Sequence, residues 1–323
     1  MSYFFVSGEE NCNFVENLIP MKRFSIILLF LATTLFASCS PRPIKALIVS
    51  GQNNHNWQVS HLVLHKILNN STLFEADIIL TPAAGEDMST FTPDFSAYDV
   101  VVLDYNGDRW PAKTDAAFLE YAQAGGGVVI YHAADNAFAS WEEFNKIIAL
   151  GGWEGRDEKS GPYYYLVDGK PTLDYSAGAG GSHGSEREYP MHCRKSDHPI
   201  TRGLPDNWIH GRDEMYDRMR GPANIKDLLY SGYAIAEKGG SGREEPLVFT
   251  VDYGKANIFH LMLGHAGPTV DNNPAMQCAG FQTLLLRGAE WAATGKVTQP
   301  VPVDFPTAES ASFRLNYKAP TAK

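Results

Sequence analysis

The chain is poor in cysteine, with only Cys12, Cys39, Cys193 and Cys278 among 323 residues. Cys193 and Cys278 do not belong to a Cys-x-x-Cys pair, so their spacing does not indicate a thiolate metal site. An exported location would permit a disulfide between them, although spacing alone does not establish one. We expect both residues to be structural.

The chain also lacks a long run of lysine or arginine, and its formal net charge is −10 at pH 7. Proteins that bind the phosphate backbone of nucleic acids depend on clustered basic residues. The acidic balance therefore argues against nucleic-acid binding and fits a soluble exported protein that handles neutral or cationic ligands. Internal repeats are lacking as well, so we expect one large α/β domain, or two small ones, after the N-terminal segment.

That N-terminal segment has the composition of an export signal. Met21-Lys22-Arg23 precedes an apolar stretch of signal-peptide length, and Leu35-Phe36-Ala37-Ser38-Cys39 resembles a bacterial lipobox. Cys39 would then be the lipidated N-terminus of a lipoprotein. A membrane-spanning helix is the alternative, but the apolar run is short and lacks a stop-transfer flank. The expected boundaries are an extension from a start codon assigned too early (1–20), the signal peptide (21–38), a linker (39–44), one domain (45–296) and a Pro-rich tail (297–323).

Apolar strands alternate with helical segments through the first half of the domain. The continuous apolar runs at 45–50 and 99–103 are typical of strands buried on both faces of a parallel sheet. Further strands are expected at 74–80 and ending at His132, with helices at 58–70, 111–124 and 140–150. This alternation predicts an α/β fold with a doubly wound, mainly parallel sheet.

A Gly- and Tyr-rich insertion follows, from Gly151 to about Gly184. Residues 177–184 are too rich in glycine for the interior of a regular element, and a loop of this length is usually functional or disordered. Strands are then expected at 163–167, 227–235, 247–252 and 256–263. Asn273-Pro274 predicts the start of a long helix that Gly295 ends.

His132 closes the apolar strand Val128–Tyr131 and precedes the small residues Ala133-Ala134. A strand that delivers one reactive side chain into such a turn is the nucleophile elbow of α/β hydrolases and amidotransferases. Those enzymes have serine or cysteine at the elbow, whereas an imidazole favours proton transfer or metal ligation. The alternative is a histidine that caps the next helix or is satisfied within the core.

Polar and aromatic side chains follow several of the expected strands. Ligands bind beyond the carboxyl ends of strands in open parallel sheets, so we expect these segments to form one crevice. Turn preferences explain Asn and Asp there, but not the convergence of Trp57, Trp110, His55, His132 and His265. Aromatic faces with amide and carboxylate partners suit a polyol such as a sugar. The expected substrate-binding residues are Asn53, His55, Trp57, Asp104, Asn106, Arg109, Asp135 and His183.

Asp213-Glu214 is a further acidic pair. Burial near the elbow would raise the pKa of Glu214 and allow it to act as an acid or base. A salt bridge to Arg212 or Arg218 is the alternative. We expect the catalytic residues to be His132, His265 and Glu214.

Four histidines, His55, His132, His183 and His265, could form a zinc or other divalent-metal site with a carboxylate. They come from loops far apart in the chain, so spacing does not test this idea. His260 differs from them because it lies inside an apolar strand, and we expect a satisfied core histidine there.

Several motifs, taken in order, make the chain resemble the ThuA-like (trehalose-utilisation) family from Lys45 to about Thr294. They are Val129-Ile130-Tyr131-His132-Ala133-Ala134, Ser182-His183-Gly184, His198-Pro199-Ile200-Thr201 with Gly203-Leu204-Pro205, Asp213-Glu214-Met215-Tyr216, Gly264-His265, and Asn273-Pro274 with Arg287-Gly288-Ala289-Glu290-Trp291-Ala292. The resemblance implies a flavodoxin-like, class I glutamine amidotransferase-like fold in which His132 replaces the amidotransferase cysteine.

The resemblance also implies a link to sugar metabolism, particularly to disaccharides and 3-keto derivatives made by partner dehydrogenases. Together with Cys39 it places the protein in the envelope of a Bacteroidota-like bacterium, facing the periplasm because no acidic run follows the lipobox. We expect a carbohydrate-processing enzyme of hydrolase, lyase or isomerase type. The alternative is a non-catalytic sugar-binding lipoprotein that serves a partner enzyme. A glutamine amidotransferase is disfavoured, because no cysteine occupies an elbow.

Overall fold

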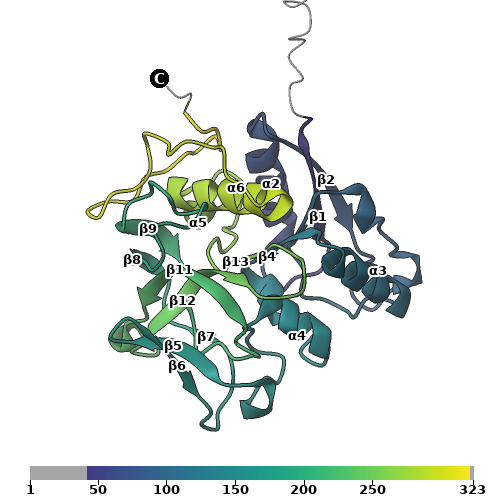
Figure 1. The fold of residues 1–323 in the computed structure, drawn as a ribbon, viewed down its shortest axis with the longest axis horizontal. Coiled ribbons are helices and arrows are strands. Elements are labelled where there is room, and N and C mark those ends of the chain that lie inside the picture. The colour runs from purple at the N-terminus through teal and green to yellow at the C-terminus, as the bar shows by residue number, and fades with distance from the viewer. Residues whose placement is uncertain (1–41, 321–323) are drawn as a thin grey trace, which may run out of the picture. The chain divides into compact units, whose positions relative to one another are not determined.

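A computed structural model describes residues 42–320, and within them the main feature is a mixed sheet of 11 strands (Figure 1). Five neighbouring strands are parallel, and we call them the parallel half. In sheet order they are β2 (Phe74–Leu80), β1 (Ile44–Ser50), β3 (Val100–Leu103), β4 (Gly127–Tyr131) and β13 (Ile258–Leu261). The apolar runs in β1, β3 and β4 are buried on both faces, which confirms the predicted α/β fold.

Helices cover both faces of the parallel half. The α2 helix (Trp57–Asn70) and the α6 helix (Ala279–Thr294) contact each other, and α6 packs on β3, β4 and β13. The α3 helix (Ala112–Gln123) and the α4 helix (Glu142–Ile148) share an aromatic cluster in which Phe138 contacts both Trp110 and Phe144. Short 3₁₀ helices are η1 (Met88–Thr90), η2 (Phe95–Ala97), η3 (His132–Asn136), η4 (Glu158–Ser160) and η5 (Ala236–Lys238).

The rest of the sheet is antiparallel, and we call it the antiparallel half. Beyond β13 it continues through β12 (Glu244–Val251), β11 (Ile225–Tyr233), β8 (Arg187–Cys193) and β9 (Asn207–Asp213), while β5 (Tyr163–Val167) pairs with β12 and β6 (Lys170–Asp174). A separate two-stranded ribbon joins β7 (Ser182–His183) to β10 (Tyr216–Asp217). The Gly-rich segment 177–184 therefore contains a short strand rather than loop alone.

The predicted C-terminal helix divides at Cys278 into α5 (Pro274–Gln277) and α6. Cys278 has extended backbone and forms a β-bridge with Phe313 of the tail. The Gln282 side chain donates to the freed carbonyls of Met276 and Gln277. A contact with residues far along the chain thus interrupts a locally favourable helix.

The C-terminal segment packs on the domain through a few buried side chains. Tyr317 is buried, and its hydroxyl donates to the carbonyl of Val270 over 2.6 Å. Arg314 is also buried, forms an ion pair with Asp304 and donates to the hydroxyl of Thr283 in α6 over 3.3 Å. These contacts attach residues 297–320 to α6 and to the loop that precedes α5.

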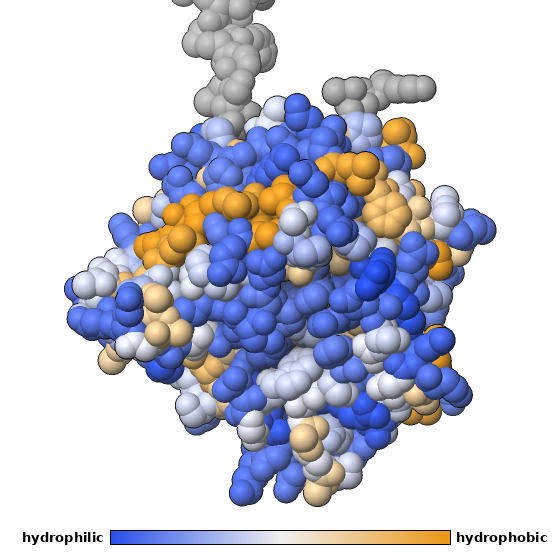
Figure 2. All heavy atoms as spheres, turned by 180° about the vertical axis from the view of Figure 1, so that it is seen from behind, coloured by the Kyte–Doolittle hydropathy of each residue, from blue (hydrophilic) through white to orange (hydrophobic). Residues whose placement is uncertain are grey.

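The surface opposite the view of Figure 1 is mostly hydrophilic, with an apolar band across its upper part (Figure 2). Between residues 42 and 320, no helix has the length and apolar character needed to span a membrane. Cys193 and Cys278 are both free. Cys39 and the expected export signal lie outside the described residues.

Candidate functional site

His132 lies at the carboxyl end of β4 with a left-handed backbone (φ 43°) and a buried side chain. Its Nδ1–H donates to the carbonyl of Met262 over 2.7 Å, because a carbonyl can only accept. Nε2 is therefore left with a lone pair, 3.1 Å from the hydroxyl of Tyr216. Burial, followed by the neighbouring His55 and His265, holds the pKa of His132 well below its ordinary value. The elbow thus presents a neutral imidazole.

His55 and His183 are held in the same way as His132. His55 follows β1, and its Nδ1 lies 3.2 Å from Oδ1 of Asn53, which also accepts the backbone N–H of His55. Nδ1 of His183 lies 2.9 Å from the carbonyl of Gly184. A hydrogen bond from Nδ1 fixes the ring and leaves Nε2 as a lone-pair donor, which is how metal-binding histidines are usually oriented.

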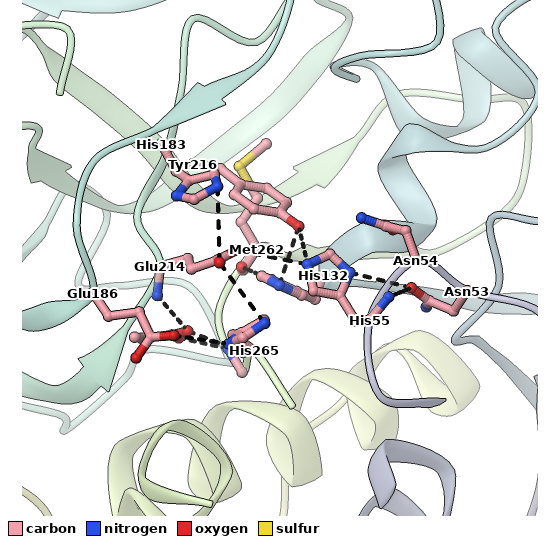
Figure 3. A network of polar contacts seen from close by, with 12 residues as sticks. Asn53, Asn54, His55, His132, His183, Glu186, Glu214, Tyr216, Met262 and His265 are labelled. Carbon is pink, nitrogen blue, oxygen red and sulfur yellow. Dashed lines mark hydrogen bonds and ion pairs between the residues drawn. The ribbon is translucent and has the colours of Figure 1, made fainter. Parts of the chain in front are cut away.

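Glu214 lies where these rings converge (Figure 3). Its Oε2 is 3.6 Å from Nε2 of His55, and its Oε1 is 3.8 Å from Nε2 of both His183 and His265. Burial acts to raise the pKa of Glu214, but the neighbouring imidazoles of His55, His265 and His183 outweigh it, and the net pKa is lowered. The expectation of a raised pKa is therefore wrong, and Glu214 is an ionised carboxylate at neutral pH.

Neither arginine of the alternative interpretation binds Glu214. Arg212 pairs with Glu186 over 2.7 Å, and Arg218 pairs with Asp217 over 3.1 Å. The carboxylate of Glu214 is thus directed towards the imidazoles.

Asp213 fixes the two segments that carry Glu214 and His265. Its buried carboxylate accepts the backbone N–H groups of Glu214 (2.8 Å), Gly264 (2.7 Å) and His265 (3.0 Å). Nε2 of the buried His210 lies 2.7 Å from the same carboxylate. Burial opposes a charge on His210, but Cys278 and Asp213 outweigh it and raise its pKa to about 9. The His210–Asp213 ion pair therefore lies within β9, and the hydrogen bonds from Gly264 and His265 to Asp213 join the end of β9 to the loop after β13.

The donor atoms can hold a divalent cation. Ligand atoms of His55, His132 and Glu214 all lie within 4.8 Å of one another, and two ligands of one tetrahedral zinc are separated by about 3.4 Å. Two imidazoles and a carboxylate, with a position open to water or substrate, match catalytic zinc sites. A second group, formed by Glu186, Glu214 and His265, meets the same distance criterion.

Aromatic rings extend the site on one side. Tyr216 stacks on His132 with ring centroids 4.4 Å apart, and Trp153 meets the edge of Tyr216 at 4.9 Å. Trp153 and Glu154 both have left-handed backbone, with φ of 51° and 48°. The buried guanidinium of Arg156 holds this turn, because it donates to the carbonyls of Gly152, Asn136 and Ala137.

A polar cleft of about 510 Å³ adjoins the imidazoles. It is lined by Gln52, Asn53, Asn54, Ala84, Asn106, Gly107, Asp108, Asn136, Trp153 and Glu154. Amides and carboxylates around an aromatic ring can bind the hydroxyls and the C–H face of a sugar. Of the expected substrate-binding residues, Asn53 and Asn106 line this cleft, while His55 and His183 lie in the imidazole cluster.

The structure places three of the expected binding residues elsewhere. Asp104 is buried, where Ser50, Ser60 and Asn53 donate hydrogen bonds to it, and burial raises its pKa to about 7. Asp135 is buried in an ion pair with His260. Arg109 pairs with Asp115 and stacks on Trp141 at 3.6 Å.

Two tryptophans of the expected rim also have other partners. Trp57 lies against His61 within α2, and Trp110 is buried among Phe91, Phe95 and Phe118. Five of the expected residues therefore lie outside both the imidazole cluster and the lining of the cleft: Trp57, Asp104, Arg109, Trp110 and Asp135. His260, by contrast, is the satisfied core histidine that was expected, since Nδ1 lies 2.8 Å from the carbonyl of Ile148.

Tyr216, Trp153 and Glu186 also belong to the site, although none of them was predicted to have a separate role. Tyr216 stands in the same motif as Glu214, two residues away, which is a usable signal. For Trp153, the signal is the surrounding glycines Gly151, Gly152 and Gly155, which mark a sharply turned backbone. Glu186 has no comparable marker in the sequence.

Known proteins show the same pattern over most of the chain. The sequence profile described as trehalose utilisation, ThuA, matches residues 45–292. A ThuA-like protein of known structure from Parabacteroides merdae is 64% identical, with a TM-score of 0.86 over 86% of this chain and 100% of the other. A ThuA-like protein from Bacteroides uniformis is 19% identical, with a TM-score of 0.50 over 81% of this chain and 96% of the other, and shows the shared fold. A comparison with curated proteins finds no match.

Proposed function

The chain belongs to the trehalose-utilisation (ThuA) family, and on that basis we propose that it is a carbohydrate-processing enzyme that uses a divalent metal ion. The ion would be held by Nε2 of His55, Nε2 of His132 and the carboxylate of Glu214. One observation carries the proposal: both imidazoles have Nδ1 engaged by an oxygen acceptor, and their Nε2 atoms, which share the Tyr216 hydroxyl as a neighbour, lie close to one ionised carboxylate.

The neighbouring side chains supply the rest of the chemistry. A bound divalent ion would act as a Lewis acid on a sugar carbonyl or hydroxyl oxygen. His265 is partly exposed beside Glu214, and its imidazole can take or give a proton at the substrate. The hydroxyl of Tyr216 can orient an oxygen between His55 and His132. Trp153 offers an aromatic face at the cleft next to them.

The sugar is proposed from the cleft and from the family. Amide side chains of Asn53, Asn106 and Asn136 line the cleft together with Trp153, a composition suited to hydroxyl groups and pyranose faces. The family description names trehalose utilisation, which supports a disaccharide or its keto derivative as substrate. An envelope location through Cys39, and a partner sugar dehydrogenase, remain part of the same proposal.

Purified protein should be stripped with a chelator, reloaded with Zn²⁺, Mn²⁺ or Co²⁺, and offered disaccharides and their 3-keto derivatives. We expect turnover only with metal, and loss of both turnover and the first metal equivalent in His132→Asn. Asparagine is chosen because it tolerates left-handed backbone. Turnover that persists in the stripped protein would overturn the metal. Calorimetric sugar binding without any product would favour the sugar-binding lipoprotein instead.

A further inference from the structure

We propose that the site holds two divalent cations, bridged by the carboxylate of Glu214. The inference rests on the proposed function, because it adds a second ion to the first. The first ion would lie between His55, His132 and Oε2 of Glu214. The second would lie between Oε1 of Glu214, His265 and Glu186, on the side of the antiparallel half, and His265 would then be a ligand of this ion instead of the group that transfers a proton.

The two oxygens of Glu214 face different partners. Oε2 is directed towards His55, whereas Oε1 is equally far from His183 and His265. A carboxylate that serves one ion through one oxygen would leave the other oxygen to solvent or to a hydrogen-bond donor. Here the second oxygen faces Nε2 of two further imidazoles, so an ion held by either of them could also bind this oxygen, and Glu214 would then bridge the two ions (Figure 3).

The second donor set is compact and chemically suitable. Ligand atoms of Glu186, Glu214 and His265 lie within 4.8 Å of one another, and Nδ1 of His265 is 3.5 Å from Oε1 of Glu186. Nε2 of His183 lies beside the same oxygen of Glu214 and can complete the set. Carboxylate and imidazole ligands suit Zn²⁺ and Mn²⁺.

The charges nearby permit a second ion. Arg212 binds Oε2 of Glu186 over 2.7 Å, which leaves Oε1 of Glu186 directed towards His265. Two glutamates would face the two ions, and the imidazoles are neutral ligands. Asp213 contributes no ligand, because backbone N–H groups and His210 occupy its carboxylate.

The competing arrangement is a single ion that all four histidines share. The two donor groups have Glu214 alone in common, and His55 and His265 do not appear in one group. Two ions about 3.5–4 Å apart, which is usual for paired metal sites, would each reach one oxygen of Glu214. A sugar oxygen placed between them could then contact both.

Metal stoichiometry tests the proposal without any assay of turnover. Full-length protein is stripped, dialysed against Mn²⁺ and measured by elemental analysis, with electron paramagnetic resonance of the loaded sample. We expect two equivalents and an exchange-coupled spectrum in the unsubstituted protein. Glu186→Ala should retain one equivalent with an uncoupled spectrum. Glu188→Ala is the matched control, since Glu188 is an exposed glutamate nearby on β8, and it should retain two.

Each result decides between the two levels of the proposal. No bound Mn²⁺ would overturn both the metal-dependent function and the second ion. One equivalent in the unsubstituted protein, unchanged in Glu186→Ala, would overturn the second ion alone and leave the function standing. Two equivalents without exchange coupling would overturn the Glu214 bridge. Circular dichroism of every variant establishes that a lost equivalent does not come from unfolding.

Discussion

The parallel and antiparallel halves contribute different chemistry to the site. The parallel half supplies imidazoles from strand ends: His55 follows β1, His132 follows β4 and His265 follows β13. The antiparallel half and its ribbon supply the carboxylates Glu214 and Glu186, the Tyr216 ring and the more exposed imidazole of His183. Neither half holds a complete donor set by itself.

The two halves also fix their side chains differently. In the parallel half, fixed oxygen acceptors such as the Met262 carbonyl orient the rings. In the antiparallel half, Asp213 accepts the backbone N–H groups of Glu214 and His265 and so positions both residues through their main chain. Because both halves contribute ligands, a substitution in either half should impair the site, and the two halves can be tested separately.

The largest effect is expected from the parallel half. His132→Asn removes the Nε2 donor at the elbow while keeping a residue compatible with φ 43°. We expect kcat/KM to fall by about 10³-fold or more, because a metal ligand and a stacked ring are lost together. Steady-state kinetics at saturating metal measure this. Unchanged turnover in folded His132→Asn protein would remove the elbow from the mechanism.

Asp104 should affect stability instead of turnover. Its pKa is about 7 in the folded protein and 3.8 in the unfolded chain. Between these two pH values the native state therefore keeps a proton that the unfolded chain releases. Stability should therefore fall by roughly 4 kcal/mol as pH rises from about 4 to about 7. In Asp104→Asn, whose amide mimics the protonated group, this slope should disappear from urea titrations. A slope identical to that of the unsubstituted protein would contradict this explanation.

A substitution in the antiparallel half should have a smaller effect on the site. Asp213→Asn weakens the hydrogen bonds that place Glu214 and His265, and we expect metal affinity to fall about 10–100-fold. Competition with a chromophoric chelator measures the affinity. Glu290→Gln is the control, because Glu290 is also buried and accepts the backbone N–H of Thr298, but it lies in α6. Equal losses of metal affinity in the two variants would show that Asp213 contributes only to the general stability of the fold.

The smallest effect is expected at the rim of the cleft. Trp153→Ala removes an aromatic face and should raise KM about tenfold, or roughly 1.4 kcal/mol, with kcat nearly unchanged. Trp141→Ala is a matched control, since Trp141 stacks on Arg109. A change in kcat alone would show that Trp153 acts on turnover together with the imidazoles and not on sugar binding.

The parallel half could be predicted from sequence because its signals are local. A continuous apolar run such as Val100–Leu103 is typical of a strand that is buried on both faces. The strand ends then followed from topology, which is why His55, His132 and His265 could be expected together. The break at Cys278 could not be predicted, because it depends on a bridge to Phe313.

Which polar residue faces the cleft was harder to predict. Asp104 and Asn106 are two residues apart after the same strand, yet Ser50 and Ser60 bind Asp104 inside the protein while Asn106 lines the cleft. Both residues are polar and follow the same strand, so only tertiary contacts determine which of them faces the cleft. The antiparallel contributors Glu186 and Trp153 were missed for the same reason, since irregular backbone carries them.

The left-handed backbone at His132 has an evolutionary consequence. The elbow is a property of the strand and turn, and it presents whatever side chain occupies that position to the same point in space. In amidotransferase-like folds a single codon change can therefore replace a nucleophile by an imidazole without rebuilding the scaffold. Inheritance of geometry and inheritance of reaction are separable at this position, so relatives can share a fold while their chemistry diverges.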